Sequence, residues 1–183
     1  MVEAQLPVYP KILELRDTLQ QANHRLVLAE SCTAGGVAAE MGQIPGISNL
    51  LCGSMVIYRN ETKAQWLNIP RLWLDDPSLG PVSDRVTRAL AQSVLEHTPE
   101  ATVGAAITGH LGPGAPSGLD GSLYCAAVHR DHPESMFSRH VRLLAPPPQG
   151  PQDLVGRQAR QREAIDTMVD FLIQFLRNGA LAP

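Results

Sequence analysis

Apolar residues recur along this chain at two spacings, and together they predict alternating helices and strands. Apolar positions three and four residues apart mark one face of a helix, whereas short continuous apolar runs are typical of buried strands. Helices are predicted from after Pro10 to about Asn23 and over residues 37–41, 60–67, 83–95 and 153–177. Strands are predicted over residues 26–29, 51–58, 101–108, 121–129 and 135–143.

The order of these elements predicts the fold class. Helices lie between the earlier strands, which favours parallel pairing, while the last two strands form a hairpin across residues 130–133. Residues 70–81 and the proline-rich residues 145–151 are predicted to be loops. We therefore expect residues 1–183 to form one α/β domain, a three-layer α/β/α sandwich with a mixed sheet.

Three polar segments follow predicted strands, at residues 30–36, 58–63 and 108–114. Ligands of such sheets bind beyond the carboxyl ends of the strands. If these segments lie side by side, they form one site.

Ser31 is the candidate nucleophile, because it lies in the turn between a strand and a helix. The backbone amides after it are then candidate donors to a developing oxyanion. The alternative is that Ser31 only caps the helix, a position for which serine is favoured.

A serine nucleophile needs a base, and composition directs attention to lysine. The 15 Lys and Arg residues comprise 13 Arg and two Lys, Lys11 and Lys63. Lysine can lose its proton where arginine cannot, so a lysine retained against this bias can mark a base. Among the histidines, only His110 falls in a candidate site loop. Lys63 follows Tyr58 by five residues, and both can face one pocket; the alternative is a rim tyrosine and a solvated lysine.

The glycine-rich loop after the strand at 101–108 has the composition of a nucleotide-contacting loop. Its glycines permit close backbone approach, and the Thr108 hydroxyl suits a phosphate or a ribose. The loop matches neither a Walker motif nor a dinucleotide fingerprint, and a plain surface turn stays open. Arg157, Arg160 and Arg162 are candidate phosphate ligands or solvated helix residues.

Charge and cysteine usage exclude several classes of function. A net charge of -3 with scattered arginines argues against nucleic-acid binding. No apolar run reaches the roughly 18 residues of a membrane helix, and MVEAQLPVYP lacks the pattern of a signal peptide, so we expect a cytoplasmic protein without a membrane partner. Cys32, Cys52 and Cys125 fit neither a disulfide framework nor a zinc site.

Together the segments resemble the CinA C-terminal domain family, which includes stand-alone nicotinamide mononucleotide amidohydrolases. The resemblance rests on the runs at 29–35, 53–63, 82–83, 108–113 and 121–124, and on an arginine at the head of the last helix. The chain departs from the common pattern at Ala34, where a glycine is usual, and at His110–Leu111, where Ile-Ala is commoner. The segment from 114 to 120 is shorter than usual, and Val155-Gly156-Arg157 replaces a Gly-Asp-Arg run.

The resemblance implies hydrolysis of nicotinamide mononucleotide (NMN) to nicotinic acid mononucleotide and ammonia, with no metal or organic cofactor. It implies roles for the following residues: Ser31 as nucleophile, Lys63 as base and Tyr58 as third catalytic member; Cys32 and Thr33 as oxyanion donors, with Glu30, Gly35 and Asn60 in support; Thr108, Gly109, Gly112 and Arg157 as substrate contacts. Two alternatives stay open: a competence- or damage-related nucleotide-binding module without turnover, and an amidase for another pyridine carboxamide. A homo-oligomer such as a dimer is also expected.

Overall fold

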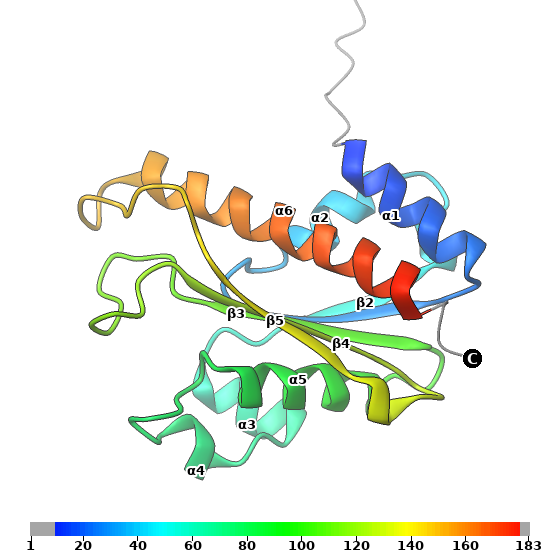
Figure 1. Cartoon of the computed structure of the whole chain (residues 1–183), viewed down its shortest axis with the longest axis horizontal. Helices are drawn as coiled ribbons and strands as arrows, with labels where there is room; N and C mark the ends of the chain where they lie inside the picture. The colour runs from blue at the N-terminus through cyan, green and yellow to red at the C-terminus, as the bar shows by residue number, and fades with distance from the viewer. Residues whose placement is uncertain (1–9, 180–183) are drawn as a thin grey trace, which may run out of the picture.

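A five-stranded mixed sheet forms the middle layer of the molecule (Figure 1). The computed structural model describes residues 10–179. The strands are β1 (Leu26–Glu30), β2 (Leu51–Val56), β3 (Val103–Gly109), β4 (Ser122–His129) and β5 (Phe137–Arg142). Their order is β2-β1-β3-β4-β5; the first three run parallel, and β4 pairs antiparallel with both β3 and β5.

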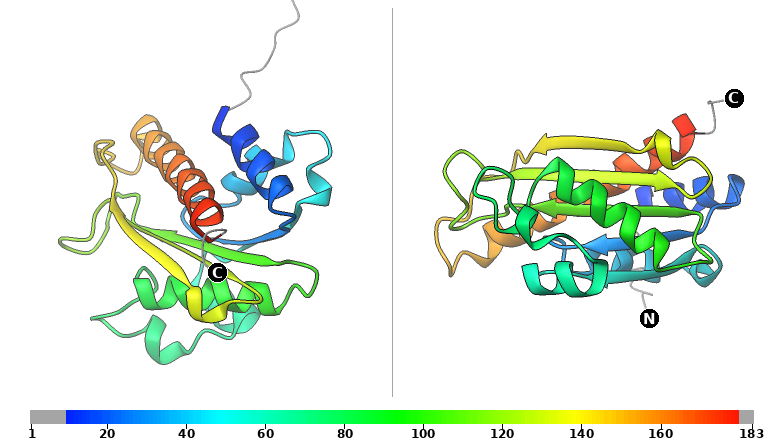
Figure 2. Two further views of the ribbon diagram at one scale, coloured as in Figure 1. Left: turned by 45° about the vertical axis from the view of Figure 1, so that its right-hand side comes forward. Right: turned by 90° about the horizontal axis from the view of Figure 1, so that it is seen from below.

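Helices cover both faces of this sheet (Figure 2). One layer contains α1 (Pro10–Gln21), α2 (Gly36–Gly42) and α6 (Leu154–Gly179), and the other contains α3 (Asn60–Leu67), α4 (Arg71–Leu74) and α5 (Asp84–Glu96). The predicted three-layer sandwich with a mixed sheet is therefore confirmed.

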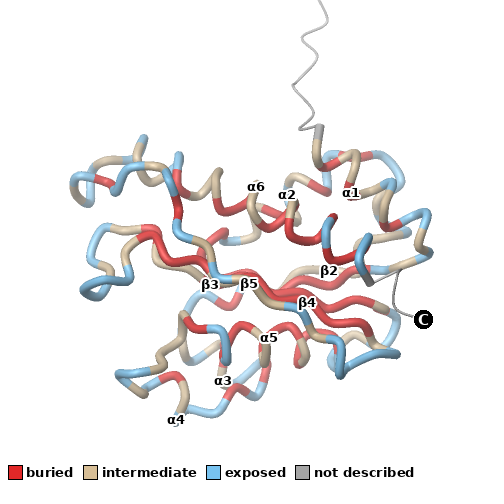
Figure 3. Tube along the Cα trace, in the orientation of Figure 1, coloured by how far each residue is buried: buried red, intermediate tan, exposed pale blue. Residues whose placement is uncertain are grey.

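Alternation along the central strands produces two apolar cores. Leu28 and Ile107 pack into the core beneath α1, α2 and α6, whereas Ala29 and Ala106 pack into the core beneath α3, α4 and α5. Because successive strand residues face opposite sides, β1 and β3 are buried on both faces, as Figure 3 shows.

Most predicted element boundaries agree with the structure, with local corrections. Strand β2 ends at Val56 rather than at Tyr58. Asn60, a residue type favoured at helix caps, is instead the first residue of α3, and Arg59 holds the cap position without a side-chain cap hydrogen bond. Ser83 does cap α5, since its hydroxyl accepts from the Val86 amide at 3.4 Å.

Two predicted segments also contain structure that the pattern did not indicate. The loop predicted over 70–81 includes the single-turn helix α4. A 3-10 turn at Pro133–Ser135 delays the start of β5. Residues 1–9, on which the expectation about a signal peptide rests, and residues 180–183 lie outside the described part of the chain. Within residues 10–179 no helix combines the length and the apolar character needed to cross a membrane.

Candidate active site

The carboxyl ends of β1, β2 and β3 lead into one pocket, which the loop after β3 and the start of α6 also border. Figure 1 shows these two segments at the same end of the sheet. The lining residues are Ser31, Cys32, Tyr58, Asn60, Lys63, Pro81, Val82, residues 109–115 and Arg157. The structure thus brings the three polar strand-end segments together.

Ser31 and Lys63 meet at the bottom of this pocket. Ser31 follows β1 and is held in line with the sheet, because its amide donates to the Ile107 carbonyl at 3.1 Å. Lys63 comes from the first turns of α3, and its Nζ lies 3.2 Å from Ser31 Oγ. Ser31 is 8% exposed and Lys63 is 2% exposed, so both are shielded from bulk water.

Two backbone carbonyls fix the Lys63 amine. Its Nζ donates to the Ile57 carbonyl at 2.8 Å and to the Tyr58 carbonyl at 3.3 Å. Carbonyl oxygens only accept, so the two carbonyls bind two N–H groups of Nζ, and the remaining site on Nζ faces Ser31 Oγ. In the neutral amine this site is a lone pair that can accept the serine proton, and in the ammonium it is an N–H that donates to the serine oxygen. The proton can therefore pass without movement of the side chain.

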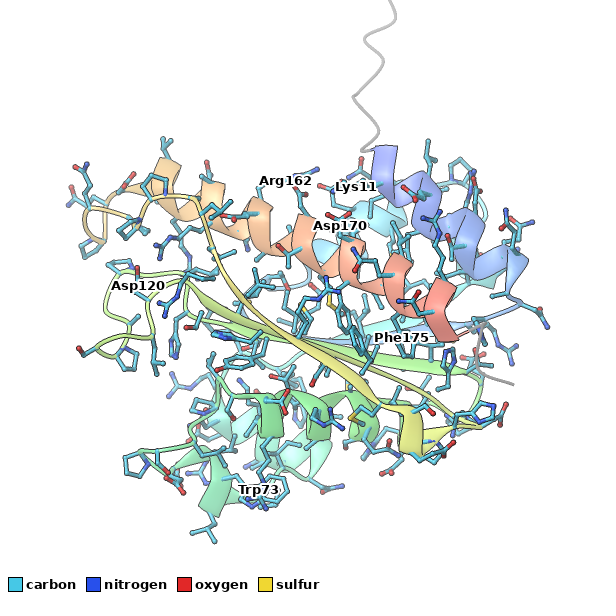
Figure 4. All side chains as sticks on the ribbon, in the orientation of Figure 1. Lys11, Trp73, Asp120, Arg162, Asp170 and Phe175 are labelled. Carbon is cyan, nitrogen blue, oxygen red and sulfur yellow. The ribbon has the colours of Figure 1, made fainter. Side chains whose placement is uncertain are left out.

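Burial also changes the acidity of this amine. It lowers the pKa of Lys63 to about 8, because the charged form loses its hydration in the protein interior. Lys63 has no carboxylate partner in the hydrogen bonds and ion pairs of the described residues. Lys11, by contrast, forms an ion pair with Asp170 that joins α1 to α6 (Figure 4). Of the two lysines, Lys63 therefore lies beside the Ser31 hydroxyl, whereas Lys11 is held in an ion pair away from the pocket.

Glu30 builds the turn that presents Ser31. Its buried carboxylate accepts from Thr33 Oγ1 at 2.7 Å and from the Val37 and Ala38 amides at 3.0 Å each. It also accepts from Ser54 Oγ at 2.9 Å. Four donors thus compensate one buried carboxylate, and the start of α2 is fixed against β1 and β2.

Two amides of the turn donate to no other described residue. The Ser31 amide bonds to Ile107 and the Ala34 amide bonds to Ser31, whereas the amides of Cys32 and Thr33 donate to no acceptor of another residue within residues 10–179. Ala34 and Gly35 then adopt left-handed backbone with φ of 54° and 88°, which turns the chain into α2. Of the two predicted oxyanion donors, Cys32 lines the pocket, whereas Thr33 is 1% exposed and is not among the lining residues.

The thiol of Cys32 is buried beside Ser31. Burial raises its pKa to about 12, so the thiol stays protonated near neutral pH. Its sulfur packs near Gly109, where an added Cβ would lie 3.1 Å from Cys32 Sγ.

Tyr58 lies at the rim of the pocket and not at its bottom, where Ser31 and Lys63 meet. Its side chain is outside the Ser31–Lys63 pair, with the residue 54% exposed. The phenol oxygen accepts from Arg157 Nη2 at 2.9 Å, and Arg157 Nη1 donates to the Gly112 carbonyl at 2.7 Å. Arg157 therefore bridges the two sides of the pocket, and the backbone carbonyl of Tyr58, not its phenol, contacts Lys63.

Of the substrate contacts predicted at the end of β3 and in the loop after it, Gly109 and Gly112 line the pocket and Thr108 does not. Thr108 is fully buried and its hydroxyl bonds to the Thr87 hydroxyl on α5 at 2.7 Å, so it is absent from the pocket lining of the described residues. Gly109 allows close packing, because a Cβ there would lie 2.6 Å from Leu123 Cδ1 and 3.1 Å from Cys32 Sγ. Gly112 has a φ of 62° and forms part of the lining.

Asn60 and Arg160 each link neighbouring elements around the pocket. Asn60 lines the pocket and its Nδ2 donates to the Leu74 carbonyl at 3.5 Å, so it links α3 to α4. Arg160 is 3% exposed and is neither a solvated residue nor a lining residue. Its guanidinium donates to Asp120 Oδ1 at 2.8 Å, which fastens the loop after β3 to α6, and to the Ala145 carbonyl at 3.1 Å, which fastens the segment after β5. Figure 4 shows Asp120 on that loop.

Two contributions to the site were missed from the sequence. The packing role of Arg160 gives no signal in the helical pattern, because its position differs little from that of exposed neighbours. The sequence indicated only weakly that His110 lies in the pocket wall, because it is the one histidine in a loop that follows a predicted strand. Among residues 10–179 no three His, Cys, Asp or Glu side chains are grouped so as to hold a metal ion.

Comparison with known proteins gives consistent matches. Residues 11–143 match the family model described as the CinA C-terminal domain. A CinA-like protein of Myxococcus xanthus is 33% identical over 115 residues, covering 60% of this chain and 26% of that protein. One of Mycobacterium marinum is 41% identical over 97 residues, covering 51% and 21%. The chain thus spans about a quarter of the length of these curated relatives.

A solved structure extends the likeness of fold beyond the matched segment. It is described as a competence-damaged protein (CinA) superfamily protein from Klebsiella pneumoniae and is 20% identical, with a TM-score of 0.80 over 94% of this chain and 99% of that chain. The family match includes Ser31, Lys63 and His110, whereas Arg157 and Arg160 lie after its last matched residue.

Proposed function

The chain belongs to the CinA C-terminal domain family, and from this premise we propose that it is an amidohydrolase that converts NMN to nicotinic acid mononucleotide and ammonia. One observation carries the proposal: Ser31 Oγ and Lys63 Nζ lie 3.2 Å apart, with the amine buried and held by two carbonyls. A hydroxyl beside an amine of lowered pKa is the arrangement that activates a serine nucleophile.

The first half of the reaction forms an ester on Ser31. Neutral Lys63 accepts the hydroxyl proton as Ser31 Oγ attacks the carboxamide carbon. The carbonyl oxygen becomes an oxyanion that the backbone amides after Ser31, first that of Cys32, stabilise, each donor contributing roughly 3–4 kcal/mol. The Lys63 ammonium then protonates the amide nitrogen, the C–N bond breaks, and ammonia leaves.

The second half returns the site to its starting state. Water attacks the ester carbon while Lys63 again accepts a proton, and the same ammonium then protonates Ser31 Oγ as the ester bond breaks. Nicotinic acid mononucleotide is released. Arg157, at the rim, supplies the positive charge for the substrate phosphate. The proposal also includes the cytoplasmic location and the homo-oligomeric state that we expect from the sequence.

Ammonia release from NMN tests the proposal. The purified chain should produce ammonia and nicotinic acid mononucleotide, and Ser31→Ala should abolish turnover while retaining NMN binding by calorimetry. Ser78→Ala, an exposed loop serine bonded to Asp76, is the matched control and should retain activity. Binding without turnover in the unmodified chain would favour the nucleotide-binding module, and turnover of another pyridine carboxamide alone would reassign the substrate.

A further inference from the structure

His110 stands in the pocket wall, and its ring nitrogens make no hydrogen bond within the described part of the chain. Its backbone, in contrast, is fixed twice: the His110 amide donates to the Ser122 carbonyl and the Gly121 amide donates to the His110 carbonyl, both at 2.9 Å. The imidazole is therefore free to bind while its attachment is rigid.

These two backbone bonds define a β-bulge. Gly121 and Ser122 together face the single residue His110, and Gly121 has a left-handed φ of 74°. This is the G1 type, in which glycine occupies the first bulge position. Such bulges are common beside active sites because they redirect a side chain. Beside His110, the Ser122 hydroxyl is buried and also lacks a hydrogen-bond partner in the described chain.

The register of the sheet places His110 at a defined depth. Glu30 pairs with Ile107, so Ser31 lies level with Thr108 and His110 follows two residues farther out. At the rise of a β-strand this is roughly 6–7 Å beyond the nucleophile. The Gly112 carbonyl, which Arg157 contacts, lies two residues farther again along the loop.

This spacing follows the layout of a pyridine ribonucleotide. With the carboxamide carbon at Ser31, the pyridine ring spans the distance to the ribose, and the phosphate lies farther out beside Arg157. Burial lowers the pKa of His110, and the charge of Asp120 opposes this shift more weakly, so the ring is neutral near pH 7. A neutral imidazole offers one donor and one acceptor, the pair that a ribose diol requires.

We propose that His110 contacts the ribose hydroxyls of the substrate and makes the site selective for a ribosylated pyridine carboxamide over the free carboxamide. This inference rests on the proposed function for the position of the substrate. It assigns His110 a binding role only, because the proton transfers at Ser31 are complete with Lys63.

Sugar phosphates test this contact separately from catalysis. We expect ribose 5-phosphate to bind the unmodified chain about tenfold more tightly than 2-deoxyribose 5-phosphate, measured by ligand-observed NMR titration. His110→Ile should reduce this ratio to about one by weakening only the ribose ligand, and His110→Asn, which retains a donor and an acceptor, should preserve part of it. His132→Ile, at an exposed histidine of the β4–β5 hairpin, is the matched control.

Steady-state kinetics of the same variants with NMN and with free nicotinamide provide a second test. His110→Ile should raise KM for NMN about tenfold with kcat unchanged, and should leave any turnover of free nicotinamide as it is. An unchanged binding ratio in folded His110→Ile, an equal loss of both sugar phosphates, or no binding of either to the unmodified chain would overturn the inference. A chain that binds both sugar phosphates with the expected ratio but releases no ammonia from NMN would refute the proposed function instead.

Discussion

At the scale of single residues, the protonation of Lys63 controls the proposed chemistry. Only the neutral amine accepts the Ser31 proton, and burial lowers the pKa of Lys63 to about 8. Below that pH the amine is an ammonium, so kcat/KM should rise about tenfold per pH unit and level off above about pH 8. Rates of ammonia release from pH 6 to 10 measure this profile; a flat profile would contradict the role of Lys63 as base.

Lys63→Arg separates a titrating base from a positive charge. Arginine keeps the charge but does not deprotonate, so we expect kcat/KM to fall about 10²-fold or more across this pH range. Lys11→Arg is the matched control, because Lys11 pairs with Asp170 on the far side of the sheet and should retain full activity. Activity retained in folded Lys63→Arg would show that the charge alone suffices.

Tyr58→Phe tests whether the phenol acts in the chemistry or at the rim. The phenol oxygen bonds to Arg157 and not to Lys63, so its loss should raise KM for NMN roughly threefold to tenfold and leave kcat within about twofold. Tyr124→Phe, whose ring stacks on His140, is the control for loss of a hydroxyl elsewhere. A large fall in kcat with unchanged KM would restore the phenol to the catalytic set implied by the family resemblance.

At the scale of elements, Glu30 determines whether the turn before α2 holds its shape. Glu30→Ala removes the acceptor of four donors, including the Val37 and Ala38 amides, and should lower the free energy of unfolding by about 3 kcal/mol in urea denaturation. Glu163→Ala is the comparison, because Glu163 also accepts two amides but beside exposed Leu144, and should cost less. Equal losses would mean that burial of the Glu30 carboxylate is not the cause.

The apolar pattern was sufficient to predict the elements that bury a face. The central strands and the long helices agree with prediction because their spacing is set by the two cores that flank the sheet. Helix α4 was missed because its four residues, Arg71–Leu74, are too few to show a period. The end of β2 was placed two residues late because Ile57 and Tyr58 continue the apolar run after the strand has ended.

Within the site, residues positioned by strand ends were predictable and those positioned by distant contacts were not. The meeting of Ser31 and Lys63 follows from the rule that parallel strands end at one edge. The phenol of Tyr58 and the hydroxyl of Thr108 face other partners, Arg157 and Thr87, which no local pattern indicates. Burial of Arg160 depends on a loop forty residues away in sequence.

At the scale of the whole molecule, the two helical layers support different parts of the pocket. The layer of α3 and α5 carries Lys63, whereas α6, in the opposite layer, carries Arg157 and holds the loop after β3 through Arg160. Ser31, the proposed nucleophile, lies between them at the end of β1. Changes in the α6 layer should therefore alter substrate binding without altering the titration of the base.

Arg160→Met tests this division. It removes the bonds to Asp120 and to the Ala145 carbonyl, and it should lower the free energy of unfolding by about 2 kcal/mol, a value reduced because the Asp120 side chain is 40% exposed. A loosened loop should raise KM for NMN, while the midpoint of the pH profile should stay near 8, because Lys63 shares no contact with this loop's ion pair.

Arg162→Met is the matched control on the same helix. Arg162 pairs with Glu40 on α2 and with Asp166, so its replacement disturbs α6 without releasing the loop after β3, and KM should be unchanged. If Arg160→Met moved the pH midpoint as well as KM, the two layers would be coupled through the strand ends. The pocket would then be one cooperative unit rather than a base and a binding wall supported from opposite faces of the sheet.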